Sequence, residues 1–130
     1  MSNNKYICVL DFEANCGFDK DSGKESEIIE FPSVLWKLEY LENSIRPTIT
    51  KISEFQIFCK PKYTPILTDF CKKLTKITQE QVDNGRPFPN ALNEHLQWLN
   101  SHIADFDNAV QLDNILLMTY GKWDMGTIAP

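Results

Sequence analysis

The sequence lacks the long apolar run that a membrane-spanning helix needs. No stretch approaches the roughly 20 consecutive apolar residues that cross a bilayer, so we expect no membrane partner. A signal-peptide core is also missing, because the apolar run from Tyr6 to Leu10 passes directly into Asp11. These absences predict an intracellular protein, either cytoplasmic or nuclear.

Cysteines with metal-binding or redox spacing are missing as well. None of the four cysteines, which are Cys8, Cys16, Cys59 and Cys71, belongs to a CxxC pair, and this argues against a zinc knuckle or a thioredoxin-type site. Without a secretory signal, free thiols are expected rather than disulfides. Cys8 and Cys59 fall in predicted strands and are expected to be small core residues.

Positive charge is scarce. The chain carries 13 Lys and Arg against 18 Asp and Glu, for a net charge of −5. This weakens the case for broad, salt-driven binding of nucleic acid. It does not exclude an enzyme that holds a nucleic-acid end through metal ions, because the metals then contact the phosphate in place of a basic face. With 130 residues, the chain is expected to form one domain around one core.

Apolar periodicity and turn residues predict an α/β domain. The first three strands are joined by short connections, which favour an antiparallel meander. The last strand follows the helices and is expected to lie parallel to the first. Pro32 predicts an edge position or a bulge near the start of the second strand. The predicted strands are 6–12, 28–39, 52–60 and 115–120, and the predicted helices are 68–74, a short helix opened by a capping box at Thr78, and 90–103.

The helix over 90–103 has the strongest helical pattern. Leu92, Leu96 and Leu99 are predicted to form its buried face. His95 and His102 are seven residues apart and share another face. We expect both to be solvated, because no third metal ligand accompanies them.

Carboxylates follow two of the predicted buried strands. Asp11 and Glu13 come at the end of the first, and Asp124 follows the last. If these strands are parallel neighbours, their carboxyl ends meet at one edge of the sheet and the three side chains converge. Such a cluster repels itself unless a hard divalent cation binds its oxygens. The alternative is that Asp11 and Glu13 only begin a solvated loop.

Two aromatic residues are ambiguous from their local pattern. Trp123, beside Asp124, is either a stacking surface for a base or a packed side chain at a helix start. Phe70 lies in the predicted helix over 68–74, and on its own pattern it is expected in the core.

Taken together, these stretches resemble the DEDDh 3′–5′ exonucleases. The first motif of that family is similar to residues 9–16 (VLDFEANC), and the second to residues 120–125 (YGKWDM). The likeness extends to the group that trims the ends of histone mRNA, ribosomal RNA and small interfering RNA. Further stretches agree in order and spacing: 27–32, 55–61, 68–71, 74–79, 82–83 and 98–99.

The resemblance implies a ribonuclease-H-like fold with a mixed sheet and a site for two divalent ions, Mg²⁺ or Mn²⁺. It assigns catalytic and metal-ligand roles to Asp11, Glu13 and Asp124. The implied substrate is the 3′ end of RNA, including single-stranded overhangs. Stacking on the terminal base is implied for Phe70 and Trp123, and contact with the terminal nucleotide for the backbone around Ala14.

One part of the family pattern is missing. Family members continue to a third motif, which supplies a general-base histidine and a fourth acidic ligand, whereas this sequence ends at Pro130. Asn15 also stands where the family often has threonine, which could alter a contact to the terminal sugar. We therefore expect residues 1–130 to be the N-terminal portion of an exonuclease domain, truncated after the fourth predicted strand, with weak activity or none.

Two non-catalytic alternatives remain open. The chain could be a binding or regulatory module that associates with itself or a partner through an uncovered sheet face. It could also be an unstable fragment, which would show poor hydrogen-exchange protection.

Overall fold

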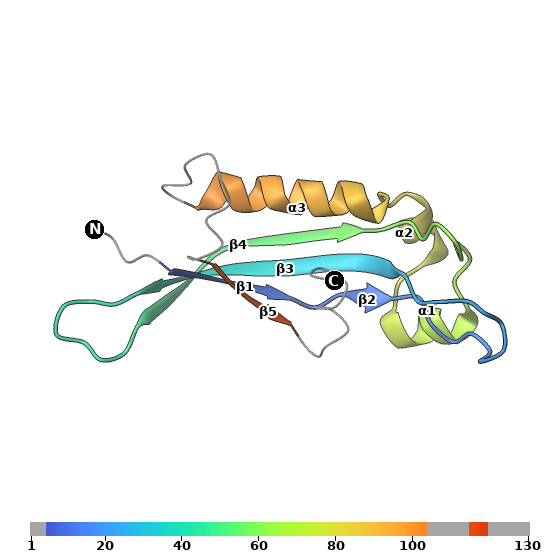
Figure 1. Ribbon diagram of the computed structural model, residues 1–130, viewed down its shortest axis with the longest axis horizontal. Coiled ribbons are helices and arrows are strands. Elements are labelled where there is room, and N and C mark those ends of the chain that lie inside the picture. The colour runs from blue at the N-terminus through green and yellow to red at the C-terminus, as the bar shows by residue number, and fades with distance from the viewer. Residues whose placement is uncertain (1–4, 104–114, 120–130) are drawn as a thin grey trace. The chain divides into compact units, whose positions relative to one another are not determined.

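The computed structural model describes residues 5–103 and 115–119. The elements run in the order β1-β2-β3-β4-α1-α2-α3-β5 (Figure 1), and this mixed sheet with helices confirms the predicted α/β class. The strands are β1 (Lys5–Leu10), β2 (Glu13–Ala14), β3 (Ile28–Glu39), β4 (Thr48–Phe58) and β5 (Ile115–Thr119). The helices are α1 (Asp69–Thr75), α2 (Gln79–Asp83) and α3 (Phe88–His102).

The described residues divide into two compact units. Unit 1 comprises residues 5–11, 33–55, 95–103 and 115–119, and unit 2 comprises residues 12–32 and 56–94. None of the helices in the described ranges is long and apolar enough to cross a membrane.

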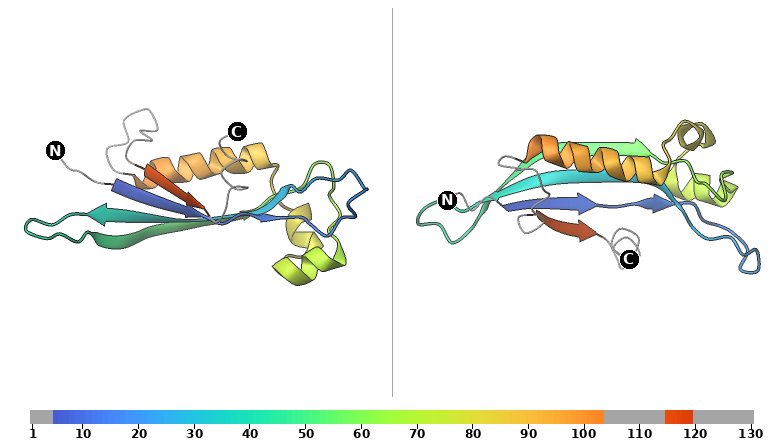
Figure 2. Two further views of the ribbon diagram at one scale, coloured as in Figure 1. Left: turned by 60° about the horizontal axis from the view of Figure 1, so that its bottom comes forward. Right: turned by 45° about the horizontal axis from the view of Figure 1, so that its top comes forward.

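Unit 1 is built on β1. This strand pairs antiparallel with β3, from Lys5 opposite Leu38 to Leu10 opposite Ser33. It also pairs in parallel with β5 (Figure 2), which confirms the predicted parallel neighbours. Because the strands are parallel, their carboxyl ends lie at the same edge, and Asp11 follows directly at the end of β1.

The second half of α3 covers one face of this sheet. Trp98 donates from Nε1 to Ser53 Oγ at 3.0 Å, and His95 Nε2 lies 2.9 Å from Ser33 Oγ. The predicted buried face of this helix is wrong for two of its three leucines, because Leu92 and Leu96 are 37% and 38% exposed. The buried residues instead recur every four positions: Ala91, His95, Leu99 and Ile103.

His95 contradicts the prediction that both histidines are solvated. It is only 5% exposed, and its Nε2 lies 3.7 Å from Cys8 Sγ in addition to the contact with Ser33. Its ring also meets Phe55 edge-on, with centroids 5.1 Å apart. Burial lowers the pKa of His95 to about 4, because desolvation disfavours the imidazolium. His102, in contrast, is exposed as expected.

Unit 2 is organised by two capped short helices. Thr68 is the N-cap of α1, where its hydroxyl accepts from the backbone N–H of Cys71. Thr78 begins α2 with the predicted capping box, in which the side chain of Gln81 accepts from the N–H of Thr78. The caps hold these helices over a buried cluster of Ile29, Leu67, Cys71, Ile77 and Val82.

The sheet confirms one of the two alternatives predicted from Pro32, the bulge near the start of β3. β3 pairs with β1, β2 and β4, so the edge alternative is wrong. A register shift does occur near the start of β3, because Glu13 pairs with Glu30 but Ala14 with Ile28. The predicted strand over 6–12 also ends earlier, at Leu10.

The four cysteines are free thiols, as expected. Cys8 and Cys59 are fully buried, which confirms their prediction as core residues. Burial raises the pKa of Cys8. It also raises the pKa of Cys59 to about 12, with smaller contributions from the charges of Glu30 and Glu94. Neither thiol is therefore expected to be reactive.

Candidate active site

The predicted carboxylates Asp11 and Glu13 flank a buried aromatic residue. Phe12 is 6% exposed, and its ring meets Phe31 and Phe88 edge-on with centroids 4.6 and 6.1 Å apart. Asp11 is exposed at the end of unit 1, and Glu13 is half-buried in β2 at the start of unit 2. Burial of Phe12 fixes the backbone that carries Glu13.

Glu13 lies close to the thiol of Cys16. The pKa of Cys16 is raised by its burial, by the neighbouring thiol of Cys71 and by the negative charge of Glu13. The carboxylate of Glu13 is therefore near enough to Cys16 to act on it electrostatically. The oxygens of a carboxylate such as that of Glu13 are suitable ligands for hard divalent cations such as Mg²⁺.

The loop after β2 is fastened to the start of α1. Thr68 donates from Oγ1 to the carbonyl of Cys16 at 2.7 Å, and the same oxygen accepts from the N–H of Cys71 at 3.0 Å. Cys71 in turn donates from Sγ to the carbonyl of Ala14 at 3.9 Å. We call residues 14–17 and 68–71 the loop–helix platform.

Phe70 is the exposed aromatic residue of this platform. Its side chain is 59% exposed, so the core position expected from its local pattern is wrong. It lies against Gly17, where an added Cβ would be 2.7 Å from Thr68 Oγ1 and 3.1 Å from Phe70 Cδ1. Because Gly17 also has a φ of +83°, both conformation and space call for glycine there. The structure thus brings Ala14 and Phe70, two predicted substrate-binding residues, onto one platform.

Two residues support the platform in a way that the sequence did not predict. Asn15 is fully buried, donating from Nδ2 to the carbonyl of Thr64 at 3.0 Å and accepting at Oδ1 from the N–H of Glu27 at 2.6 Å. The carboxylate of Glu27 accepts from the N–H groups of Lys62, Tyr63 and Thr64 at 2.8 to 3.2 Å. Both polar atoms of the Asn15 amide are used within the protein, so this residue fixes the loop.

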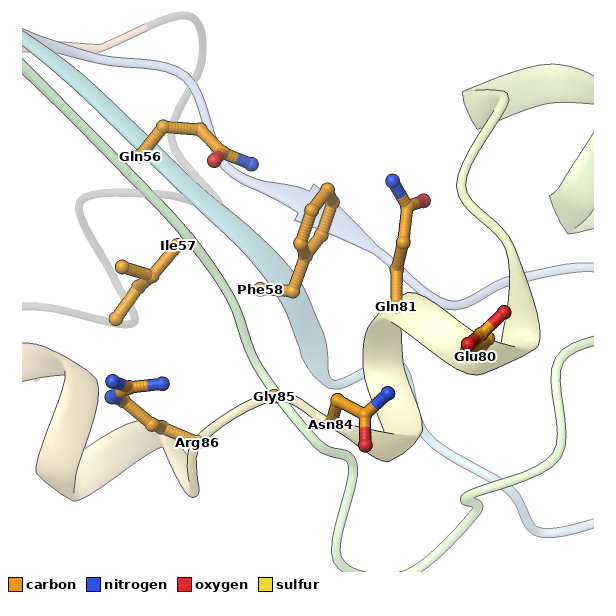
Figure 3. Close-up of a pocket in the computed structure, with 8 residues that line it drawn as sticks. All are labelled: Gln56, Ile57, Phe58, Glu80, Gln81, Asn84, Gly85 and Arg86. Atoms are coloured by element: carbon orange, nitrogen blue, oxygen red, sulfur yellow. The ribbon is translucent and has the colours of Figure 1, made fainter.

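A separate pocket of about 430 Å³ lies between the end of β4, α2 and the connection to α3 (Figure 3). Two of its polar side chains are engaged with carboxylates. Arg86 donates from Nε to Glu94 at 2.9 Å, and Gln56 donates to Glu30 at 2.8 Å. In Figure 3 the side chains of Phe58 and Gln81 lie on the opposite side of the β4 ribbon from Arg86. The lining contains none of the predicted site residues.

The remaining predicted residues, Asp124 and Trp123, lie outside the described residues. Over residues 5–103 and 115–119, no group of three or more His, Cys, Asp or Glu side chains gathers as a metal site would require. The convergence of Asp124 on Asp11 and Glu13 therefore stays a prediction.

Comparison with known proteins places the chain in a family. The sequence model of the family described as Exonuclease, of RNase T type, matches residues 8–122. Human 3'-5' exoribonuclease 1 is 38% identical over 120 residues, which are 92% of this chain. The nuclease domain of 3'hExo, a DEDDh family member solved bound to rAMP, aligns with a TM-score of 0.67 at 34% identity over 95% of this chain. A structure of histone mRNA stem-loop recognition by 3'-exonuclease aligns over 96% of this chain with a TM-score of 0.64 at 34% identity.

The chain spans about a third of the human relative, 31% of its length, and about half of the two solved chains, 55% and 50%. The match nevertheless runs through β1, both platform segments and β5. The family assignment therefore rests on nearly the whole chain. The chain belongs to the DEDDh 3′–5′ exonuclease family, with its ribonuclease-H-like fold.

Proposed function

We propose that this chain carries a 3′–5′ exoribonuclease-type site that hydrolyses the terminal phosphodiester bond of RNA and releases nucleoside monophosphates. The observation that carries the proposal is the arrangement in unit 2. There Glu13 directly precedes the loop–helix platform, in which the carbonyl of Ala14 accepts from Cys71 and the ring of Phe70 is exposed. The reported likeness to RNA-end nucleases supports RNA as the substrate class. We expect the protein to act inside the cell.

Asp11, Glu13 and Asp124 would hold the divalent ions, Mg²⁺ or Mn²⁺. The donor set fits such ions, because carboxylate oxygens are the ligands that hard cations prefer. The exposure of Asp11 and the partial exposure of Glu13 leave both carboxylates accessible. Two bound ions would supply Lewis-acid activation of water and stabilisation of the leaving oxygen.

The platform would bind and orient the terminal nucleotide. Phe70 offers a flat exposed ring, and base–aromatic stacking contributes about 1–3 kcal/mol per base. We propose that Trp123 stacks on the same terminal base. The side chain of Phe70 lies beside Gly17, in the same platform as the backbone of Ala14. A base stacked there has its sugar and phosphate oriented before reaction.

The general base is the catalytic group that is hardest to assign in this chain. The sequence has two histidines. His95 is buried against Ser33 and Cys8, so it cannot reach a substrate water, and His102 lies in the last turn of α3. General-base catalysis typically contributes about 10²–10⁴-fold in rate. We therefore propose that residues 1–130 alone hydrolyse RNA weakly or not at all.

The test uses a short single-stranded RNA with the 130-residue chain, in Mg²⁺ and in Mn²⁺. The expected result is slow release of nucleoside monophosphates or none, together with metal-dependent binding of AMP. Asp11→Asn and Glu13→Gln should abolish both. Glu42→Gln is the control, because Glu42 is an exposed carboxylate in the turn between β3 and β4. Rapid hydrolysis that Asp11→Asn abolishes would contradict the predicted impairment, and metal-independent AMP binding would contradict the site.

A second function is favoured by the sheet face of unit 1 that lies opposite α3. The register places Ile7, Val9, Trp36, Leu116 and Met118 on this face, and Leu116 and Met118 are 59% and 47% exposed. Exposed apolar clusters commonly mark interaction sites. A non-catalytic module would use this face to bind a second copy of the chain.

Sedimentation of the purified chain tests this second function. Self-association that Met118→Lys abolishes supports it, and a monomer at all concentrations contradicts it. Ile45→Lys is the control, because Ile45 is 97% exposed in the turn between β3 and β4.

A further inference from the structure

A second pocket of about 430 Å³ lies in unit 2, between two loops. Its lining comes from residues 23–27 on one loop and from Tyr63 and Thr64 on the other. Asn15 donates to the carbonyl of Thr64 at 3.0 Å, so the pocket wall is tied directly to the loop that carries Ala14. The pocket is therefore held in a fixed relation to the loop–helix platform.

Tyr63 presents an exposed ring on a rigid backbone. Its side chain is 79% exposed. The N–H groups of Lys62, Tyr63 and Thr64 all donate to the carboxylate of Glu27 at 2.8 to 3.2 Å, which fixes the loop. Binding on this ring would order little additional chain, because a tyrosine side chain has only two rotatable angles and its backbone is already held.

One ammonium group lies over this ring, and a second belongs to Lys24 of the pocket lining. Lys62 Nζ lies 5.2 Å from the centroid of Tyr63, and Lys24 Nζ lies 5.8 Å from that of Phe18. Within the part of the chain that the structure describes, neither ammonium group makes an ion pair, whereas Lys37, Lys51, Lys72 and Arg86 do. Both charges remain available to an external anion.

One of the two carboxylates of the lining is already engaged within the protein. Glu27 is directed to the three N–H donors of the opposite loop, which offset its negative charge locally. Glu25 is the other acidic residue of the lining. In the pocket of Figure 3, by contrast, the guanidinium of Arg86 is paired with Glu94 and the amide of Gln81 caps α2. The pocket beside Tyr63 is therefore the better candidate for an external ligand.

We propose that Tyr63, Lys62 and Lys24 form a second nucleotide subsite for single-stranded RNA. One base stacks on the ring of Tyr63, and the flanking phosphates contact the two ammonium groups. Exposed aromatic rings combined with cations are the usual elements of single-strand binding surfaces. An acidic peptide would use the cations but not the ring, and for this reason the observations favour RNA. The inference rests on the proposed function, because the RNA bound here is the one whose end lies on the platform.

Fluorescence anisotropy with two probes tests the subsite. The probes are AMP, which occupies the platform alone, and a labelled oligoribonucleotide about ten nucleotides long, within the usual length range of single-strand sites. Tyr63→Ala should weaken binding of the oligoribonucleotide about tenfold, as loss of one stacked base predicts, and leave AMP affinity unchanged. Tyr63→Phe should bind like the parent chain, because the ring is kept.

The contribution of the two lysine charges to RNA binding is measured separately. Changing both Lys24 and Lys62 to Gln should reduce the slope of log affinity against log salt by about 1.4, since each phosphate contact on a single strand contributes about 0.7. Lys5→Gln is the matched control, because Lys5 is an exposed lysine at the start of β1 in unit 1. An unchanged slope in the double variant would overturn the phosphate contacts.

Tyr40→Ala controls for loss of any exposed tyrosine, because Tyr40 is 61% exposed in unit 1. If Tyr63→Ala binds the oligoribonucleotide as tightly as the parent chain does, the subsite is wrong while the proposed function stands. If the parent chain binds neither probe, the proposed function fails and the subsite fails with it. If polyglutamate displaces the RNA and Tyr63→Ala has no effect, the subsite is wrong and this surface is assigned to an acidic protein partner.

Discussion

Acidification should destabilise this protein through His95. The residue is 5% exposed between Ser33, Cys8 and the rings of Phe55 and Trp98. Burial lowers its pKa from 6.5 to about 4 in the folded chain. Between these values the unfolded chain binds a proton and the folded chain does not, so free energy of unfolding is lost as pH falls through this window.

The size of the effect follows from the shift. A lowering of the His95 pKa from 6.5 to about 4, at about 1.4 kcal/mol per unit, predicts a loss of roughly 3 kcal/mol. The loss begins near pH 6.5 and is complete near pH 4. A typical small domain has a free energy of unfolding of about 5–15 kcal/mol, so this single group removes a large fraction of it.

Urea unfolding followed by tryptophan fluorescence measures this loss. Trp98 is a suitable reporter, because its ring centroid lies 5.2 Å from that of His95. His95→Gln keeps a donor for Ser33 but cannot titrate. Between pH 6.5 and 4 its free energy of unfolding should therefore fall by roughly 3 kcal/mol less than that of the parent chain. His102→Gln, on the same helix but exposed, should behave like the parent chain. If the free energy of unfolding changes equally with pH in His95→Gln and in the parent chain, the reasoning is refuted.

The remaining predictions concern unit 2. Gly17→Ala should destabilise the chain by more than Gly23→Ala in thermal unfolding, because both glycines have positive φ but only Gly17 has neighbours within 4 Å. An equal loss would show that the contact with Phe70 is unimportant. Thr78→Ala should lower the free energy of unfolding by about 1 kcal/mol through loss of its cap, as measured in urea. Glu27→Gln should weaken hydrogen-exchange protection of the amides of residues 62–64, and unchanged protection there would contradict the anchoring role of Glu27.

Local patterns predicted the elements of the fold well. The capping residues Thr68 and Thr78 begin the helices predicted for them, because the cap interaction depends only on residues three positions apart. The parallel placement of β5 beside β1 followed from the helices between them and the right-handed crossover rule. In both cases the determining physics is local or topological.

Tertiary partners decided where prediction failed. His95 is buried because Ser33 and Cys8 satisfy its ring, and neither partner can be identified from the helix sequence. His95 lies on the buried face of α3, whereas Leu92 and Leu96 are partly exposed. Apolar periodicity alone assigns such a histidine to the solvated face.

In the candidate site, too, local spacing was predictive and contacts between distant residues were not. The spacing of Asp11 and Glu13 after a buried strand identified them as candidate ligands. The support of the platform was not predictable, because Glu27 binds backbone groups that lie 35 residues or more along the chain. Phe70 was assigned to the core from its local pattern, and its exposure depends on the loop at Gly17 that packs beneath it.

The central claim is that Asp11 and Glu13 hold divalent ions next to the platform. Paramagnetic broadening of amide resonances by Mn²⁺, recorded on the 130-residue chain with AMP present, tests it most directly. Selective broadening is expected around residues 11–16 and at the start of α1, and it should be lost in Asp11→Asn and Glu13→Gln. Broadening that spares these amides, or that persists in both variants, would contradict this claim.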